Sequence, residues 1–186
     1  YDESQSEFTL STPAQLAGLA YLSKTESFEG KTIVLDRDID LAGLKWEPIG
    51  TIGSFMGNFD GGGHEIHNLH SEISSSTTVY VGLFGGLYRA HVAHVVLADD
   101  CTVKGPTYVG GITGQALEST IRSCVNYAEV SVESPYGIAG GIVGISVSSV
   151  IDLCENRGTV SVMLQNTGAY SSYQGYVGGI AGSIVN

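Results

Sequence analysis

The stretch YVGGITGQALESTIRSCVNYAEVSV, residues 108–132, decides the fold because the chain repeats it in register. It returns as IAGGIVGISVSSVIDLCENRGTVSV, residues 138–162, with matched positions 30 residues apart. Apolar residues, glycines and cysteines keep their places between the two copies, as Cys124 and Cys154 illustrate. Self-similarity at a fixed period of this length is typical of repeat proteins. The sequence therefore predicts a stack of similar units.

A glycine-rich segment marks the same place in four successive units. These segments are VGLFGG at 81–86, VGGITG at 109–114, AGGIVG at 139–144 and VGGIAG at 177–182. They start 28, 30 and 38 residues apart, and each interval fits about three short strands and no helix. A unit made only of strands cannot bury its apolar face alone, whereas stacked units align their apolar residues into internal columns. The spacing predicts an all-β solenoid of about four coils, held together by parallel strand ladders ~4.8 Å apart.

Aligning the units predicts which residues share a column. One predicted column holds Ile66, Val92, Ile121 and Ile151, and another holds Leu69, Val95, Cys124 and Cys154. The same alignment places Asn68 opposite His94, Ser123 and Leu153 at a corner. Cys124 and Cys154 would then be neighbours on adjacent coils, within the Cα separation of ~4.4–6.8 Å that a disulfide requires. Because side chains in a parallel ladder point the same way, we expect free, buried thiols.

Residues 1–54 are expected to form an N-terminal cap, followed by repeats over residues 55–186. In the cap, Thr12, Pro13 and Gln15 occupy the N-cap, first-turn and capping-box positions of a short helix. Its apolar face would hold Leu16, Leu19 and Ala20. A bare solenoid end exposes strand edges, and this helix would cover them. At the other end VGGIAGSIVN opens another unit, so we expect further domains in the same polypeptide.

Charge and hydropathy argue against several classes of function. The 186 residues include 8 Lys or Arg and 19 Asp or Glu, a formal net charge of −11. Such a surface is repelled by phosphate backbones and anionic lipids, so we expect no nucleic-acid partner and no membrane insertion. No run reaches the ~18 consecutive apolar residues that a spanning helix needs. Three cysteines without CxxC spacing argue against a zinc finger or a disulfide framework.

One family resemblance rests on a succession of motifs. They are IDL, WEPIG, FMGNFDGGGHEIHNL, YVGLFG, YVGGITG and CVNYAEV. Over residues 12–186 the chain resembles bacterial surface proteins bearing GLUG repeats, with FDGGGHEIHNL and the GLFG/GGIxG alternation as the specific parts. The resemblance implies a right-handed parallel β-helix on a secreted or cell-surface protein. Many members are described as adhesin-like, and some repeats accompany zinc peptidases that cleave immunoglobulins. The family implies no shared catalytic residues.

Histidines and carboxylates cluster in three places without the spacing of a catalytic or metal site. HEIHN at 64–68 is not HExxH, and His67 aligns with varied residues, so we expect it in solvent. Four acids at EF-hand ligand spacings are Asp36, Asp38, Asp40 and Glu47. Leu41 stands where that loop needs glycine. Asp60 and Asp99-Asp100 are better explained as turn residues than as a pair of catalytic carboxylates. We expect no catalytic residue, no metal site and no cofactor.

The spacers between units differ most, and they fall at one corner of every coil. They span residues 74–78, 105–107, 133–136 and 165–175. Insertions along one edge of a solenoid often form its binding face. The longest spacer has the composition of an adaptable binding loop, although a tolerated surface insertion explains it as well. Its candidate ligand-binding residues are Asn166, Tyr170, Tyr173 and Gln174. Tyr108 is the fifth candidate.

Tyr108 belongs to a recurring aromatic position, shared with Tyr80 and Tyr176, just before the glycine-rich segment. Such a column could stack sugar rings, but the parity of a straight strand favours a core position. The leading hypothesis is a non-enzymatic, adhesin-like module on a bacterial surface or secreted. It would bind a host glycan or extracellular protein through the corner loops, or act as a rigid spacer. The alternative is a substrate-positioning region of a larger secreted peptidase or glycan-degrading enzyme.

Overall fold

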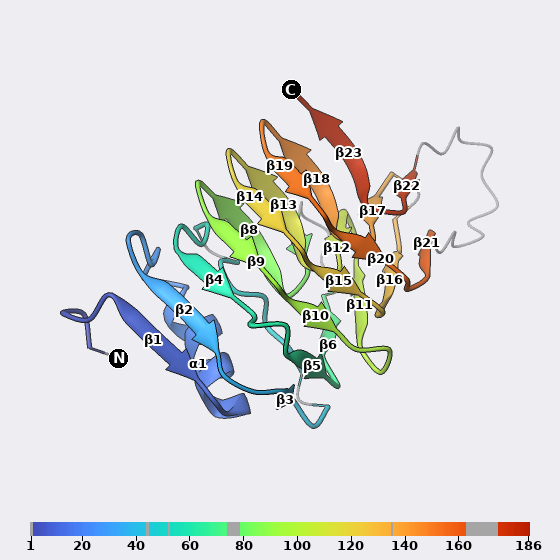
Figure 1. Ribbon diagram of the computed structural model, residues 1–186. Coiled ribbons are helices and arrows are strands. Elements are labelled where there is room, and N and C mark those ends of the chain that lie inside the picture. The colour runs from blue at the N-terminus through green and yellow to red at the C-terminus, as the bar shows by residue number, and fades with distance from the viewer. Residues whose placement is uncertain (1, 44, 52, 74–78, 135, 163–174) are drawn as a thin grey trace.

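The protein is a parallel β-solenoid, seen here in a computed structural model (Figure 1). The structure describes residues 2–43, 45–51, 53–73, 79–134, 136–162 and 175–186. Within these residues the chain winds through five parallel sheets, numbered here 1 to 5 in the order in which each coil meets them. Four coils, β4 to β8, β9 to β13, β14 to β18 and β19 to β23, follow an N-terminal cap. The predicted fold is confirmed.

The five sheets are built from very short strands. Sheet 1 contains β1 (Glu7–Leu10), β2 (Thr32–Leu35), β4 (Asn58–Asp60), β9 (His91–Ala93), β14 (Thr120–Arg122) and β19 (Val150–Asp152). Sheet 2 contains β3 (Ile39–Asp40), β5 (Glu65–His67), β10 (Val96–Leu97), β15 (Val125–Asn126) and β20 (Glu155–Asn156). Sheet 3 contains β6 (His70–Glu72), β11 (Thr102–Gly105), β16 (Glu129–Val132) and β21 (Val160–Val162). Sheet 4 contains β7 (Tyr80–Val81), β12 (Tyr108–Gly110), β17 (Ile138–Gly140) and β22 (Tyr176–Gly178). Sheet 5 contains β8 (Phe84–Tyr88), β13 (Thr113–Leu117), β18 (Val143–Val147) and β23 (Ala181–Val185).

Each coil therefore has five strands, and the prediction of about three was wrong. The extra corners are made by single residues with left-handed backbone. His94, Ser123 and Leu153, at φ of 52°, 53° and 52°, turn the chain from sheet 1 into sheet 2. Arg89, Glu118 and Ser148, at φ of 50°, 49° and 47°, turn it from sheet 5 into sheet 1. The alignment of the units predicts the corner at His94, Ser123 and Leu153. The residue types at Arg89, Glu118 and Ser148 rarely adopt positive φ, so nothing in the sequence marks the corner between sheets 5 and 1.

The predicted register holds for the later units and fails for the first. Ile121 pairs with Val92 and Ile151, as expected, but Ile66 pairs with Leu97. The place expected for Ile66 is taken by Phe59. The physical reason is the DGGG turn after β4, which lengthens a corner that later coils make with one residue. Asn68 accordingly lies beside Asp100, its backbone N–H donating to Asp100 Oδ1 at 3.0 Å, and not opposite His94.

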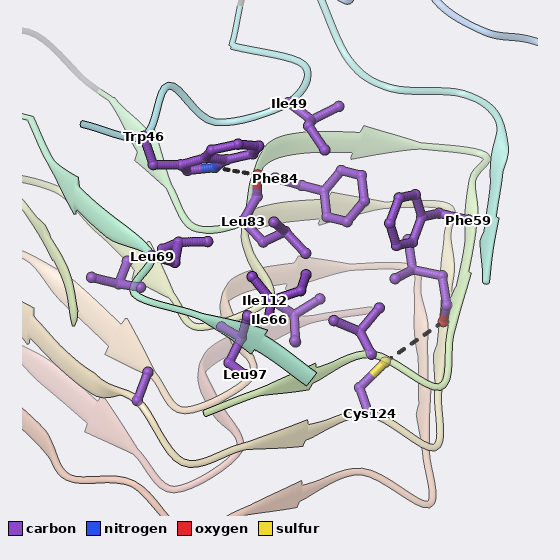
Figure 2. Packing of buried hydrophobic residues seen from close by; sticks show 14 of the residues in the cluster. Trp46, Ile49, Phe59, Ile66, Leu69, Leu83, Phe84, Leu97, Ile112 and Cys124 are labelled. Atoms are coloured by element: carbon purple, nitrogen blue, oxygen red, sulfur yellow. Dashed lines mark hydrogen bonds between the residues drawn. The ribbon is translucent and has the colours of Figure 1, made fainter. Parts of the chain in front are cut away.

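The core is aromatic near the cap and aliphatic further on. Phe55, Phe59 and Phe84 are fully buried, and the Phe84 ring centroid lies 5.3 Å from that of each of the other two. The buried indole of Trp46 donates from Nε1 to the Leu83 carbonyl at 3.0 Å (Figure 2). Successive coils continue these layers as columns of aligned side chains, such as Val81, Val109, Ala139 and Val177. Each coil thus buries the residues of its neighbour.

The doubled glycines let backbone segments touch where sheets 4 and 5 meet. A Cβ at Gly114 would lie 2.4 Å from Val81 N, and a Cβ at Gly144 would lie 2.8 Å from Val109 N. A Cβ at Gly111 would lie 2.5 Å from the Gly141 carbonyl. No side chain fits at such distances, so these glycines are required by the packing of the coils.

The N-terminal cap consists of β1, helix α1 (Pro13–Leu22) and the segments that lead to the first coil. The predicted N-cap is confirmed, because Gln15 N donates to Thr12 Oγ1 at 3.3 Å; the return bond to Gln15 Oε1 comes at 2.7 Å from the N–H of Ser11, one residue before the N-cap. The predicted apolar face is buried, at Leu16, Leu19 and Ala20. In the described part of the chain, no helix combines the length and hydropathy required to cross a membrane.

The three cysteines are free thiols at internal positions. Cys101 and Cys124 are buried and Cys154 is half-buried on the last coil. The Cys101 thiol donates to the Ile66 carbonyl at 3.2 Å, and burial raises its pKa to about 12. A hydrogen bond with Cys154, together with burial, raises the pKa of Cys124. Because a thiol with a raised pKa stays protonated at neutral pH, the thiols of Cys101 and Cys124 are weak nucleophiles there.

Candidate functional site

Of the five predicted ligand-binding residues, one has a described position. Asn166, Tyr170, Tyr173 and Gln174 lie outside the residues that the structure describes. Tyr108 is the first residue of β12 and is half-buried. The site is therefore built outward from Tyr108.

Tyr108 belongs to a ladder on sheet 4, named here the tyrosine ladder: Tyr80, Tyr108, Ile138 and Tyr176. The Tyr80 and Tyr108 rings stack with centroids 5.3 Å apart and planes at 26°. Both rings are half-buried and Tyr176 is 54% exposed, so the expectation of a core position was wrong. The straight-strand assumption fails because β12 ends at Gly110 and β13 begins at Thr113. Ile112 is fully buried, whereas the tyrosines face outward.

A side chain that the sequence did not reveal joins the tyrosine ladder. Gln115 Nε2, on β13 of sheet 5, donates to the Tyr80 hydroxyl at 3.1 Å. The equivalent positions on neighbouring coils are Gly86 and Ile145, so no repeat pattern marked Gln115. The ladder thus combines aromatic ring edges, phenol hydroxyls and one carboxamide. These groups can contact the apolar face and hydrogen-bond the polar groups of a sugar or a peptide.

The tyrosine ladder borders the corner between sheets 3 and 4, where the spacers lie. Coils stay connected across this corner, since Ile138 N donates to the Thr107 carbonyl at 2.6 Å and Tyr108 N donates to the Val79 carbonyl at 3.2 Å. Tyr136, in a spacer, is 59% exposed. An exposed aromatic side chain therefore lies two residues before Ile138 of the ladder.

Histidines and carboxylates form a second cluster, at the corners flanking sheet 2. His94 Nδ1 lies 3.0 Å from Asp60 Oδ1, and His64 Nδ1 lies 3.3 Å from Asp38 Oδ1. His67 is half-buried, with Nδ1 3.0 Å from Asp100 and Nε2 3.1 Å from Glu65. His67 faces outward as expected, with 32% of its side chain exposed, although the first-coil alignment from which this was argued was wrong. The hydrogen bond to Asp100 raises the pKa of His67.

The carboxylates of this cluster accept hydrogen bonds from backbone N–H groups at the corners of the coils. Asp40 accepts from Asn68 Nδ2 at 2.8 Å and from Ala42 N at 2.7 Å, and these bonds lower its pKa. Asp60 accepts from Gly62 N at 2.9 Å, which confirms its predicted role in the turn. Among the described residues, no three His, Cys, Asp or Glu side chains are arranged to hold a metal ion. The cluster acts as a set of structural ion pairs and turn caps.

A third polar group lines a shallow groove on sheet 3. Its lining includes Lys45, His70 and Glu72. Lys45 forms a parallel bridge with His70, and Glu72 lies two residues further along the same strand face. His70 Nδ1 lies 2.8 Å from Thr102 Oγ1. Glycoside hydrolysis needs two carboxyl groups about 5–10 Å apart, and among the described residues that line this groove Glu72 alone carries one.

Comparison with known proteins adds information at the level of the fold. No protein-family model matches the chain, and no curated protein matches it significantly. A solved structure described as a putative immunoglobulin A1 protease from Bacteroides ovatus is similar, with a TM-score of 0.64 and 22% sequence identity. The likeness covers 95% of this chain and 61% of that chain. What the two share is the fold. The resemblance to GLUG repeats stays a prediction.

Proposed function

We propose that this chain is a rigid, non-enzymatic module of a larger bacterial protein, secreted or on the cell surface. It binds a host glycan or an extracellular protein along the tyrosine ladder and the adjoining corner. The observation that carries the proposal is the half-buried, stacked pair of Tyr80 and Tyr108 on adjacent strands of sheet 4, with the Tyr80 hydroxyl bonded by Gln115. The resemblance to surface proteins with GLUG repeats supports the location.

The physical argument is one of preorganisation. Tyrosine offers a large amphipathic surface with few rotatable bonds, and a ring already stacked on its neighbour loses little freedom when a ligand binds. The ladder rests on parallel strands fixed by coils on both sides at Tyr108. The phenol hydroxyls and the Gln115 carboxamide can donate and accept hydrogen bonds, which would orient a bound ligand on the ladder.

A glycan and matrix-protein array probed with the labelled chain tests this proposal. Tyr108→Ala and Tyr80→Ala are expected to reduce the signal at least tenfold. Tyr21→Ala, which removes a tyrosine 72% exposed on α1, is the matched control and should leave it unchanged. Shortening residues 165–175 tests the predicted part of the loop separately. Binding that survives both ladder substitutions contradicts the proposal, and no binding on any array favours a spacer role.

The alternative is a region that positions a protein substrate for a catalytic domain elsewhere in the polypeptide. The solved structure described as a putative immunoglobulin A1 protease supports it, because the likeness spans 61% of that chain. Immobilised immunoglobulin A1 tests it: capture that depends on Tyr108, with the immunoglobulin intact by mass spectrometry, indicates substrate holding. Cleavage of an array glycan that Lys45→Ala and His70→Ala abolish would instead indicate an enzyme.

A further inference from the structure

The cap end of the solenoid carries an open strand edge beside a groove. β1 is the outermost strand of sheet 1 and pairs only with β2 (Figure 1). The Ser6 carbonyl accepts from Thr32 N at 2.8 Å and the Leu10 carbonyl accepts from Asp36 N at 3.3 Å. Because alternate residues of a strand bond to the same side, the N–H and C=O groups of Glu7 and Thr9 point away from β2. Helix α1 lies beside β1, and among the described residues no second strand pairs with this edge.

A groove of about 380 Å³ runs along β1, between the strand and the helix. Glu7, Phe8 and Thr9 line it from β1, and Leu19 and Leu22 line it from α1. Its walls thus combine apolar side chains with polar ones, among them Gln5 and Gln15, next to a row of backbone groups that can pair with another strand. An extended peptide satisfies both features at once, because its main chain bonds to the edge and alternate side chains enter the groove.

A glycine in the helix gives independent support. Gly18 lines the groove, and a Cβ built on it would meet no atom within 4 Å. Glycine is among the least favourable residues inside a helix, so it is normally found there where packing demands it. No such demand comes from the described residues around Gly18. Its effect is to keep the groove open over the middle of α1.

The charges near β1 indicate which kind of peptide strand would bind at this edge. Asp2, Glu3 and Glu7 are acidic, and residues 2–7 contain no basic residue. Lys31, with Nζ 2.6 Å from the Glu3 and Gln5 carbonyls, adds one positive charge beside these three acids, so the edge is still net negative, and no lysine or arginine lines the groove. Two copies of this edge would repel each other, whereas a basic peptide is attracted.

We propose that β1 and the groove beside α1 form a β-augmentation site for an extended, basic peptide segment of another protein, with an apolar side chain seated opposite Gly18. This surface is separate from the tyrosine ladder, which lies on sheet 4. The proposal therefore stands or falls independently of the function proposed above.

Two substitutions close the site without harming the fold. Gly18→Leu extends a side chain into the groove from a position where its Cβ meets no atom within 4 Å, and it improves helix propensity. Thr9→Pro removes an outward N–H and leaves the β1–β2 ladder intact, because proline is tolerated where its nitrogen faces away from the partner strand. Thermal unfolding is expected to give Gly18→Leu a midpoint at or above that of the wild type.

A positional-scanning array of nonapeptides, varied among basic, acidic, aromatic and aliphatic residues, provides the probe. The expected binders alternate apolar and basic residues. Their affinity should fall at least tenfold with Gly18→Leu, with Thr9→Pro, or when alternate peptide amides are N-methylated. Tyr21→Ala and Tyr108→Ala should leave it unchanged. No selective binding, or binding that ignores both Gly18→Leu and Thr9→Pro, overturns the proposal. So does a dimer, seen by analytical ultracentrifugation, that Thr9→Pro dissociates.

Discussion

Buried serines interrupt the apolar columns of the solenoid. Ser71 lies in a column with Val103, Val130 and Val160, and it is 1% exposed. Its hydroxyl has no hydrogen-bond partner within the described part of the chain. A hydroxyl that leaves water without finding a partner opposes folding. By contrast, the buried Ser119 hydroxyl accepts from Ala90 N at 3.1 Å and donates to the Leu117 carbonyl at 2.8 Å.

Replacing these two serines should have opposite effects. Ser71→Ala is expected to raise the free energy of unfolding by about 1 kcal/mol, because it removes an unsatisfied polar group. Ser119→Ala should lower it by about 1–3 kcal/mol, since the buried Ala90 N–H loses its acceptor. Urea denaturation followed by circular dichroism measures both changes. A loss of stability in Ser71→Ala would show that its hydroxyl is satisfied after all.

His67 and Asp100 make stability depend on pH. The pKa of His67 is raised, so its contribution is complete below its unfolded-state value of about 6.5 and is lost as pH rises through the folded-state pKa. Burial raises the pKa of Asp100, but hydrogen bonds from Asn68 N–H and His67 outweigh burial and lower it. The contribution of Asp100 is complete above about pH 4 and is lost as pH falls.

The pair should therefore stabilise the fold most between about pH 4 and pH 6.5. His67→Gln is expected to lower the free energy of unfolding more at pH 5.5 than at pH 8.5, by at most about 1 kcal/mol because the pair is partly exposed. Arg122→Gln is the control, since Arg122 forms a surface ion pair with Asp152 at 3.3 Å that contains no histidine. Equal effects of His67→Gln at the two pH values would contradict this account.

At the scale of the elements, glycine contacts fix how sheets 4 and 5 meet. A Cβ at Gly111 would lie 2.6 Å from Oδ1 of Asn126, which is fully buried. Asn126 Oδ1 accepts from Ala128 N at 3.2 Å, and Asn126 Nδ2 donates to Asn156 Oδ1 at 2.8 Å. Gly111 thus leaves room for an asparagine ladder between the last two coils.

Gly111→Ala should disrupt both contacts together. We expect it to lower the free energy of unfolding by about 1–3 kcal/mol, because the backbone on one side and Asn126 on the other leave no space for a methyl group. Gly18→Ala, which meets no neighbour, is the matched control and should raise it by up to about 1 kcal/mol. Thermal denaturation of the two variants decides the point, and a neutral Gly111→Ala would refute the close packing.

The elements also show where reading the sequence succeeds. Columns through Ile121 and Ile151 could be predicted because the two units have equal length. The column through Ile66 could not, because the DGGG turn in the first coil is longer than the one-residue corner at His94. The five-strand coil was hidden for a related reason, since Arg89 and Glu118 carry no signal for left-handed backbone. Where tertiary packing determines the backbone geometry of a turn, the residue type at that position does not reveal it.

At the scale of the whole molecule, the solenoid and its helical cap follow from the repeat and the capping box. The candidate site was less predictable. Tyr108 was found from its recurrence, but its outward direction depends on the break between β12 and β13. Gln115 reaches Tyr80 across 35 residues of sequence, a contact that no local pattern encodes.

The stacking of coils predicts a gradient of local stability along the molecule. Coil β14 to β18 has neighbours on both sides, whereas β19 to β23 are the edge strands of their sheets. Apolar residues on the last coil are correspondingly exposed, with Ile184 at 64% and Val177 at 47%. Hydrogen exchange should therefore protect amides of β14 to β18 more than those of β19 to β23 in the isolated chain. Equal protection would mean that a second molecule covers the edge.

The one-residue corners at His94, Ser123 and Leu153 have a consequence for how such a chain can change over evolutionary time. An added residue there would shift the following strand by one place, and every inward side chain in it would turn outward. The corner between sheets 3 and 4 carries no such constraint, and the spacing between units varies across it. Insertions and deletions among descendants of this sequence should therefore gather beside the tyrosine ladder, where a change in length alters the surface and leaves the columns intact.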